Sequence, residues 1–164
     1  MNSTIPYIIL SWYSAPRRDE DILEFRSVTA IIQNTDTGKY LALEFISNEF
    51  WLVWWKVESW ETDEEAILRE ITEESGYSHP KIEGIIFKEA YCRGYKVRKS
   101  VDEFVTERVY FVTVSESNNT QIRDEEEWIE KLHWLTQDKM LSSLTLEHHL
   151  YYFRSYLNQK NTWQ

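Results

Sequence analysis

The chain has 164 residues and a formal net charge of −10, from 18 Lys and Arg against 28 Asp and Glu. This length suits one domain, and a content of 42% hydrophobic and 15% aromatic residues excludes a disordered chain. The acidic excess argues against binding to nucleic-acid duplexes, and no apolar run approaches the roughly 18–20 residues that span a bilayer, so we expect no membrane partner. Cys92 is the only cysteine, which excludes an internal disulfide and favours a reducing, cytoplasmic location.

The chain divides into an N-terminal arm or edge strand over residues 1–25 and one domain over 26–164. Runs rich in β-branched residues alternate with polar turns, and two stretches have the spacing of amphipathic helices. We therefore expect strands over 26–34, 39–45, 50–53, 81–95, 103–115 and 127–135, and helices over 63–75 and 145–157. This order predicts a single domain of the α/β (α+β) class.

The helix over 63–75 has the clearest boundaries in the chain. Thr62 can cap its start, and Glu65 completes the pattern of a capping box. Gly76 follows at a position where a left-handed residue is favoured, so the helix is expected to end there.

Three glutamates share one face of this helix. Glu70, Glu73 and Glu74 stand at spacings i, i+3 and i+4, and like charges at this spacing repel by a few tenths of a kcal/mol. Grouped carboxylates are the oxygen ligands that Mg²⁺ or Mn²⁺ prefers. The same spacing is also typical of a solvent-exposed helix face, so the spacing by itself leaves both interpretations open.

A longer pattern surrounds these glutamates. Glu61 is followed, after seven intervening residues, by the run Arg69-Glu70-Ile71-Thr72-Glu73-Glu74-Ser75-Gly76-Tyr77. This pattern resembles the signature of the Nudix hydrolases, G-x5-E-x7-R-E-U-x-E-E-x-G-U, in which U is a bulky apolar residue. The resemblance extends over residues 26–157 and implies an α/β/α sandwich with a mixed β-sheet.

The resemblance also implies an activity. It is that of a metal-dependent pyrophosphohydrolase, which cleaves a phosphoanhydride in a nucleoside diphosphate linked to another moiety. The three helix glutamates would hold Mg²⁺ or Mn²⁺, with Glu125 as a further carboxylate from outside the motif. Arg69 would orient the adjacent carboxylates, and Glu61 would brace the junction between loop and helix. The implied catalytic residues are Glu61, Arg69, Glu70, Glu73 and Glu74.

Aromatic residues after the helix are candidates for substrate binding. Relatives that split dinucleoside polyphosphates often carry a tyrosine at a fixed distance past the motif, and Tyr95 lies 18 residues past Tyr77. Tyr95 and Tyr91 are therefore expected to contact a small-molecule nucleotide, and a nucleoside polyphosphate is slightly favoured. Packing within a sheet explains the same tyrosines equally well.

Tryptophans stand at three glycine positions of this pattern. Trp55 replaces the first glycine of the motif, Trp54 its usual neighbour, and Trp60 a glycine that is common before Glu-Thr. Glycine permits positive φ and a close approach of backbone to ligand, so these indoles bring catalysis by the chain into question. Exposed indoles also favour association, for example as a homodimer. A genetic code that reads UGA as glycine would explain a chain with 4 glycines and 8 tryptophans, and UGG codons at these positions would exclude that explanation.

Two alternatives to an active enzyme stay open. The first is a catalytically impaired Nudix-like domain that binds a nucleotide or a protein partner. The second is an acidic scaffold that uses only its surface. Turnover that depends on a divalent metal separates the enzyme from the binding domain, and the scaffold predicts no metal or nucleotide binding at all.

Overall fold

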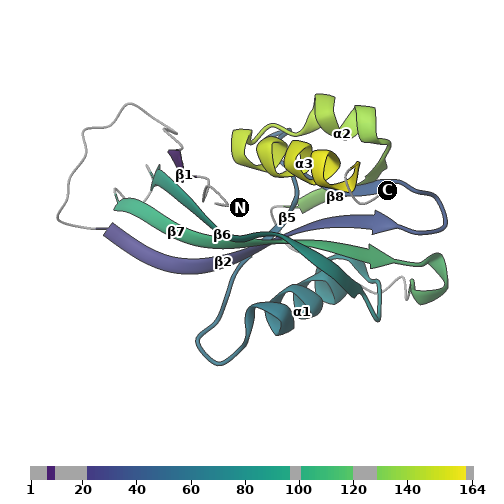
Figure 1. Cartoon of the computed structure of the whole chain (residues 1–164), viewed down its shortest axis with the longest axis horizontal. Helices are drawn as coiled ribbons and strands as arrows, with labels where there is room; N and C mark the ends of the chain where they lie inside the picture. Colours follow the sequence, from purple (N-terminus) through teal and green to yellow (C-terminus); the bar gives the residue numbers. More distant parts are fainter. Residues whose placement is uncertain (1–6, 10–21, 97–100, 120–128, 162–164) are drawn as a thin grey trace.

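The computed structural model describes residues 7–9, 22–96, 101–119 and 129–161 (Figure 1). The strands in this part of the chain are β1 (Tyr7–Ile9), β2 (Ile22–Asn34), β3 (Tyr40–Phe45), β4 (Phe50–Trp51), β5 (Val53–Lys56), β6 (Lys81–Lys96), β7 (Val101–Val114) and β8 (Ile129–Leu135). The α-helices are α1 (Asp63–Ser75), α2 (Gln137–Ser143) and α3 (Glu147–Lys160).

The strands form one mixed sheet. Its order is β1-β6-β7-β2-β3-β4, and β5 and β8 join it by pairing with β2 and β3. β2 and β7 run parallel from the pair Ile22 and Asp102 to the pair Asn34 and Val114, and β1 is parallel to β6. The β6–β7, β2–β3 and β3–β8 pairs are antiparallel. Parallel neighbours require a long connection, and α1 lies within the one between β2 and β7.

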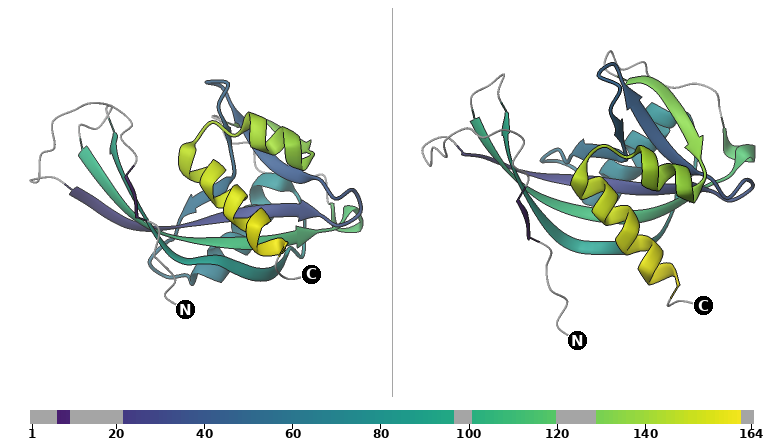
Figure 2. Two further views of the ribbon diagram at one scale, coloured as in Figure 1. Left: turned by 45° about the horizontal axis from the view of Figure 1, so that its top comes forward. Right: turned by 90° about the horizontal axis from the view of Figure 1, so that it is seen from above.

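Helices cover both faces of the sheet. α1 lies against one face, and α2 and α3 lie against the other (Figures 1 and 2). A hydrophobic core lies on each side of the sheet, and alternate residues of β2 point into one or the other. Ala30 and Ile32 pack with α1, whereas Ile31 packs with α3. The α/β/α sandwich with a mixed sheet is therefore confirmed.

The structure differs from the expected elements in three places. β2 begins at Ile22, ahead of the expected start at residue 26. Helix α2 lies between β8 and α3, where we expected none, because its 7 residues are too few to show a helical period. β5 extends as a regular strand through two of the tryptophans at glycine positions. Within the described ranges, none of the helices is both long and apolar enough to cross a membrane.

Candidate active site

Local hydrogen bonds fix helix α1 at both ends. The backbone N–H of Glu65 donates to Thr62 Oγ1 at 3.2 Å, and the N–H of Thr62 donates to Glu65 Oε2 at 2.9 Å, so the predicted capping box is present. Gly76 ends the helix with a φ of 72°, and its N–H donates to the Thr72 carbonyl at 3.0 Å. These two caps determine where the glutamate face begins and ends.

Arg69 gathers three of the predicted carboxylates, those of Glu61, Glu70 and Glu73, into one cluster. Its Nε and Nη2 donate to the two carboxylate oxygens of Glu61 at 3.1 and 3.0 Å. Its Nη1 donates to Glu70 Oε1 at 2.7 Å and to Glu73 Oε2 at 2.9 Å. The hydrogen bonds from Arg69 hold the pKa of Glu61 below its ordinary value, so that Glu61 is ionised at neutral pH.

The three helix glutamates differ in their burial. Glu74 is buried, Glu70 is partly buried, and Glu73 is the most exposed of the three. Burial raises the pKa of Glu70, and the neighbouring Arg69 offsets part of this rise. A cation beside partly buried carboxylates reduces the cost of keeping them ionised, and a set made only of oxygen ligands suits a hard divalent ion. The residues present therefore fit Mg²⁺ or Mn²⁺.

Two arginines that the sequence analysis did not single out meet at the start of α1. Arg26 Nη2 lies 2.8 Å from Asp63 Oδ1, and Arg108 Nη1 lies 2.7 Å from Asp63 Oδ2. Asp63 is buried, whereas both arginine side chains remain largely exposed. The arginines come from the neighbouring strands β2 and β7, so the parallel register of these strands brings them together. No spacing in the sequence could have revealed this pair.

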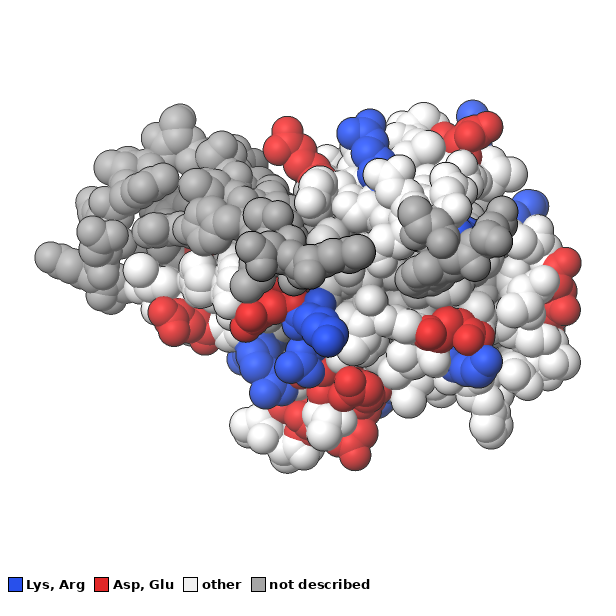
Figure 3. Space-filling view, viewed as in Figure 1, with Lys and Arg blue, Asp and Glu red and all other residues white. Residues whose placement is uncertain are grey.

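An open pocket of about 400 Å³ is lined in part by Arg26. Within it, Lys56 Nζ lies 6.0 Å from the centroid of the Phe25 ring. Figure 3 shows Lys and Arg atoms beside Asp and Glu atoms in the lower part of the view, where α1 lies. The pocket therefore presents two cationic residues beside one glutamate, on a protein that is acidic as a whole. Its lining residues are Phe25, Arg26, Lys56, Val57, Glu58 and Ser59.

The tryptophans at glycine positions have backbone conformations that any L-residue adopts. Trp54 and Trp55 lie in β5, which pairs with β2, and Trp60 lies in the turn before α1. In the described residues, positive φ outside glycine occurs only at Asn48 and His79. The conformational freedom of glycine is therefore not used at the three positions in this chain.

The indole side chains of these residues have different surroundings. The Trp54 ring lies 6.3 Å from the Phe25 ring in an edge-to-face arrangement. Trp55 points to the other face of the sheet and packs against the core under α1. Trp60 is 79% exposed. The indoles thus add side-chain volume at these positions, while the backbone of β5 stays regular.

The expected substrate-binding residues are only partly described. Tyr91 lies in β6 and stacks on Phe104 of β7, with ring centroids 5.7 Å apart and an interplanar angle of 23°. Tyr95 lies further along β6, opposite Asp102. Glu125 lies outside the described residues.

The sequence matches the NUDIX domain over residues 24–156, and the chain belongs to this family. Among curated proteins, no sequence matches the chain. The family assignment agrees with the mixed sheet between helices and with the cluster that Arg69 forms with Glu61, Glu70 and Glu73.

Solved structures share this fold. A NUDIX hydrolase from Nitrosomonas europaea aligns with a TM-score of 0.59 at 17% identity and covers 84% of this chain and 91% of its own. The C. elegans Ap4A hydrolase, in a binary complex, aligns with a TM-score of 0.63 at 13% identity. The alignment covers 84% of this chain and 98% of the hydrolase. The NUDIX domain of Shewanella oneidensis NrtR, complexed with ADP ribose, aligns with a TM-score of 0.64 at 13% identity. The alignment covers 84% of this chain and 88% of the NrtR domain. At these identities the likeness is one of fold.

Proposed function

We propose that this protein is a metal-dependent pyrophosphohydrolase that cleaves a phosphoanhydride in a nucleoside diphosphate linked to another moiety. The single observation that carries the proposal is the cluster in which Arg69 binds Glu61, Glu70 and Glu73 at distances of 2.7–3.1 Å. Membership of the NUDIX family supports hydrolysis of pyrophosphate bonds.

Each residue of the cluster has a distinct role in this proposal. Glu70, Glu73 and Glu74 hold Mg²⁺ or Mn²⁺ through their carboxylate oxygens. When bound, the divalent ion supplies charge stabilisation at the phosphoryl oxygens and lowers the pKa of coordinated water. Arg69 is a positioning residue, because its hydrogen bonds restrict the rotamers of Glu70 and Glu73. Glu61 holds Arg69 in turn through two parallel hydrogen bonds.

The substrate is proposed to be a nucleotide with a chain of phosphates. Arg26 and Lys56 line the pocket beside α1, and cations there attract phosphates to a protein whose net charge would otherwise repel them. Tyr91 and Tyr95 are proposed to contact the base, and the flat stack of Tyr91 on Phe104 offers an aromatic face for it. A nucleoside polyphosphate is favoured among such substrates.

Mg²⁺-dependent hydrolysis of a nucleotide panel tests the proposal. The panel includes nucleoside triphosphates, dinucleoside polyphosphates, ADP-ribose and nucleotide sugars, and product phosphates are resolved by anion-exchange chromatography. Glu74→Gln is expected to lower kcat by about 10²–10³, because a lost metal ligand removes several kcal/mol of charge stabilisation. Glu147→Gln, an exposed glutamate at the start of α3, is the matched control and keeps full activity. Equal activity of Glu74→Gln and Glu147→Gln would refute the assigned role.

The second candidate is a domain that binds a nucleotide without hydrolysing it. The observation that favours it is the bulk of Trp54 and Trp55 in β5, at positions where the family motif has glycine. The triple variant Trp54→Gly/Trp55→Gly/Trp60→Gly separates the two candidates. Turnover that appears in this variant and disappears with Glu74→Gln would identify the indoles as the block. A folded wild type and a folded variant that both bind a nucleotide from the panel without turnover would favour the binding domain. Sequencing the gene at the three codons tests the UGA explanation separately.

A further inference from the structure

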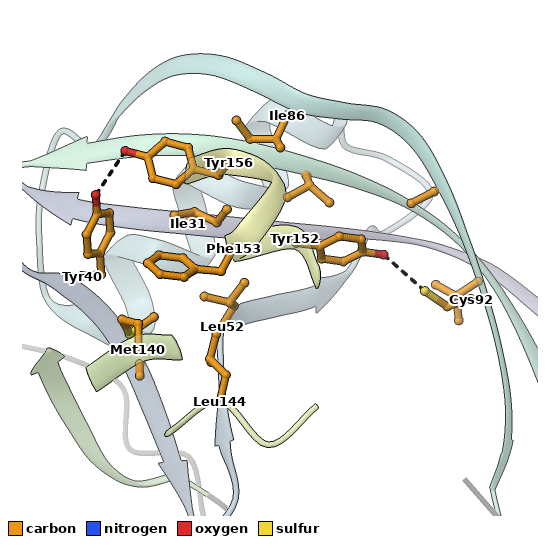
Figure 4. Packing of buried hydrophobic residues seen from close by; sticks show 14 residues of the cluster. Ile31, Tyr40, Leu52, Ile86, Cys92, Met140, Leu144, Tyr152, Phe153 and Tyr156 are labelled. Atoms are coloured by element: carbon orange, nitrogen blue, oxygen red, sulfur yellow. Dashed lines mark hydrogen bonds between the residues drawn. The ribbon is translucent and has the colours of Figure 1, made fainter. Parts of the chain in front are cut away.

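A second cluster of metal-ligating side chains lies on the opposite face of the sheet from α1. Cys92 of β6, Glu107 of β7 and His148 of α3 place one thiol, one carboxylate oxygen and one imidazole nitrogen within 4.8 Å of one another. All three residues are buried. Figure 4 shows the Cys92 sulfur directed toward the hydroxyl of Tyr152, which lies 3.3 Å from Cys92 Sγ.

Glu107 is an unusual residue for the interior of a sheet. Its carboxylate accepts hydrogen bonds from the hydroxyl of Thr29, from the hydroxyl of Tyr152 at 2.6 Å and from the thiol of Cys92 at 3.7 Å. All these donors are neutral, and within the described part of the chain no Lys or Arg forms an ion pair with Glu107. Buried carboxylates are normally paired with a cation or coordinate a metal. The environment therefore provides ligands and lacks a positive charge.

The three ligand types suit a borderline-soft metal ion, and the distance between two of them is close to that in such a site. Zinc is bound by thiolate, imidazole and carboxylate in tetrahedral sites, with Zn–S near 2.3 Å and Zn–O near 2.0–2.2 Å. Two such ligands are about 3.5 Å apart across a tetrahedral angle, and Cys92 Sγ lies 3.7 Å from Glu107 Oε2. The set differs from the α1 glutamates, which offer only oxygen and suit a hard ion.

The third ligand comes from a pair of adjacent, buried histidines in α3. The adjacent His149 has another task, because its Nδ1 accepts the backbone N–H of Leu52 at 3.0 Å. Of the two neighbouring histidines, His148 is the one with a ring nitrogen within 4.8 Å of both the Cys92 thiol and a Glu107 carboxylate oxygen.

We propose that Cys92, Glu107 and His148 form a binding site for Zn²⁺, next to the Tyr152 hydroxyl. On binding, the ion displaces the thiol proton of Cys92 and any proton on Glu107, and both are released to solvent. A thiolate and a carboxylate then neutralise the two positive charges of the ion. The site joins β6, β7 and α3, so its role is structural, and it is separate from the proposed Mg²⁺ site.

Cobalt(II) provides a direct test in the full chain. The protein is unfolded and freed of metal with a chelator. Co²⁺ is then titrated in two experiments, one in which it is added before the chain is refolded and one in which it is added after refolding. A thiolate ligand gives a charge-transfer band in the near ultraviolet, and Cys92 is the only cysteine, so this band can come from no other residue. We expect one equivalent of Co²⁺ to bind with this band and with the visible spectrum of a tetrahedral site, and Zn²⁺ to displace it. Co²⁺ at the α1 glutamates would give neither signal.

Paired variants assign the ligands. Cys92→Ser abolishes the band, and His148→Asn weakens Co²⁺ and Zn²⁺ binding by more than about 100-fold. His79→Asn is the matched control, because His79 is exposed and asparagine tolerates its φ of 58°; this variant binds like the wild type. Zn²⁺ raises the thermal unfolding midpoint of the wild type by more than it raises that of Cys92→Ser.

The wild-type titration decides the proposal even where a variant fails to fold. Absence of the thiolate band and of zinc by elemental analysis, in protein that is folded by circular dichroism, would overturn it. That result would mean that neutral hydrogen bonds alone hold Glu107. None of these readouts depends on turnover, so they stand or fall independently of the proposed hydrolase activity.

Discussion

Replacing Arg69 with methionine tests whether the carboxylate cluster is held by one guanidinium. Arg69→Met keeps most of the length of the side chain and removes four hydrogen bonds to Glu61, Glu70 and Glu73. We expect the variant to be less stable at neutral pH, because three carboxylates then remain close together without a cation.

The size of the loss follows from the exposure of each partner. The Glu61 side chain is 7% exposed and that of Arg69 is 37% exposed. Breaking a buried ion pair costs about 3–5 kcal/mol and an exposed one about 0.2–1 kcal/mol, which places this half-buried pair near 2 kcal/mol. The Glu73 side chain is 42% exposed, so its contact adds only about 0.3–0.5 kcal/mol. The total is about 2–3 kcal/mol, or a fall of about 1–1.5 M in the urea midpoint for a slope near 2 kcal/mol per M.

The pH dependence distinguishes charge from packing. The pKa of Glu61 is lowered from 4.5 in the folded state, so its contribution to stability is fully present above 4.5 and is lost as the pH falls through the lower value. Loss of Arg69 also raises the pKa of Glu70 further, and this lowers the free energy of unfolding of the variant at neutral pH. The difference between wild type and Arg69→Met is therefore expected to be large at pH 7 and to shrink in acid.

Urea unfolding followed by tryptophan fluorescence measures this difference at pH 7 and pH 3. Arg69→Lys is the control, since it keeps the charge but not the planar fork, and its midpoint is expected to lie between the other two. Equal urea midpoints for all three proteins at pH 7 would refute the stabilising role of Arg69 in the cluster. A deficit of Arg69→Met that is as large at pH 3 as at pH 7 would assign it to packing.

Three further predictions concern other parts of the molecule. Trp55→Gly is expected to lower the free energy of unfolding by about 2–3 kcal/mol, because Trp55 packs on the core. Trp60→Gly is expected to change it by less than about 0.5 kcal/mol, because Trp60 is exposed. Equal urea unfolding midpoints for the two variants would contradict this prediction. In the presence of chelator, Glu107→Gln is expected to gain stability relative to the wild type as the pH rises. Burial raises the pKa of Glu107 in the folded state, so the contribution of Glu107 to stability is fully present below pH 4.5 and is lost as the pH rises through the higher folded-state pKa. Parallel curves of unfolding free energy against pH for the two proteins would contradict this prediction. Lys56→Ala is expected to raise KM for nucleotides about tenfold at low salt with kcat nearly unchanged, and a fall in kcat at constant KM would place Lys56 elsewhere in the reaction.

Features that depend on neighbours along the chain could be predicted from the sequence alone. The capping box of Thr62 and Glu65, the end at Gly76 and the shared face of the glutamates all follow from spacing within one helix. The alternation of apolar residues likewise predicted most of the strands, and the motif led to the NUDIX family. These features are local because helix hydrogen bonds and caps join residues only three or four apart.

Only the tertiary structure decided which distant residues meet. The parallel register of β2 with β7 brings Arg26 and Arg108 to one carboxylate, and no propensity of either segment encodes that register. In the same way, Cys92, Glu107 and His148 are unremarkable in the sequence and converge only because β6, β7 and α3 pack together. The three tryptophans show the same limit, since the motif marks their positions but only the pairing of β5 with β2 shows which face each indole of that strand occupies. Contacts across strands and layers depend on the whole packed chain, and short-range pattern carries no information about them.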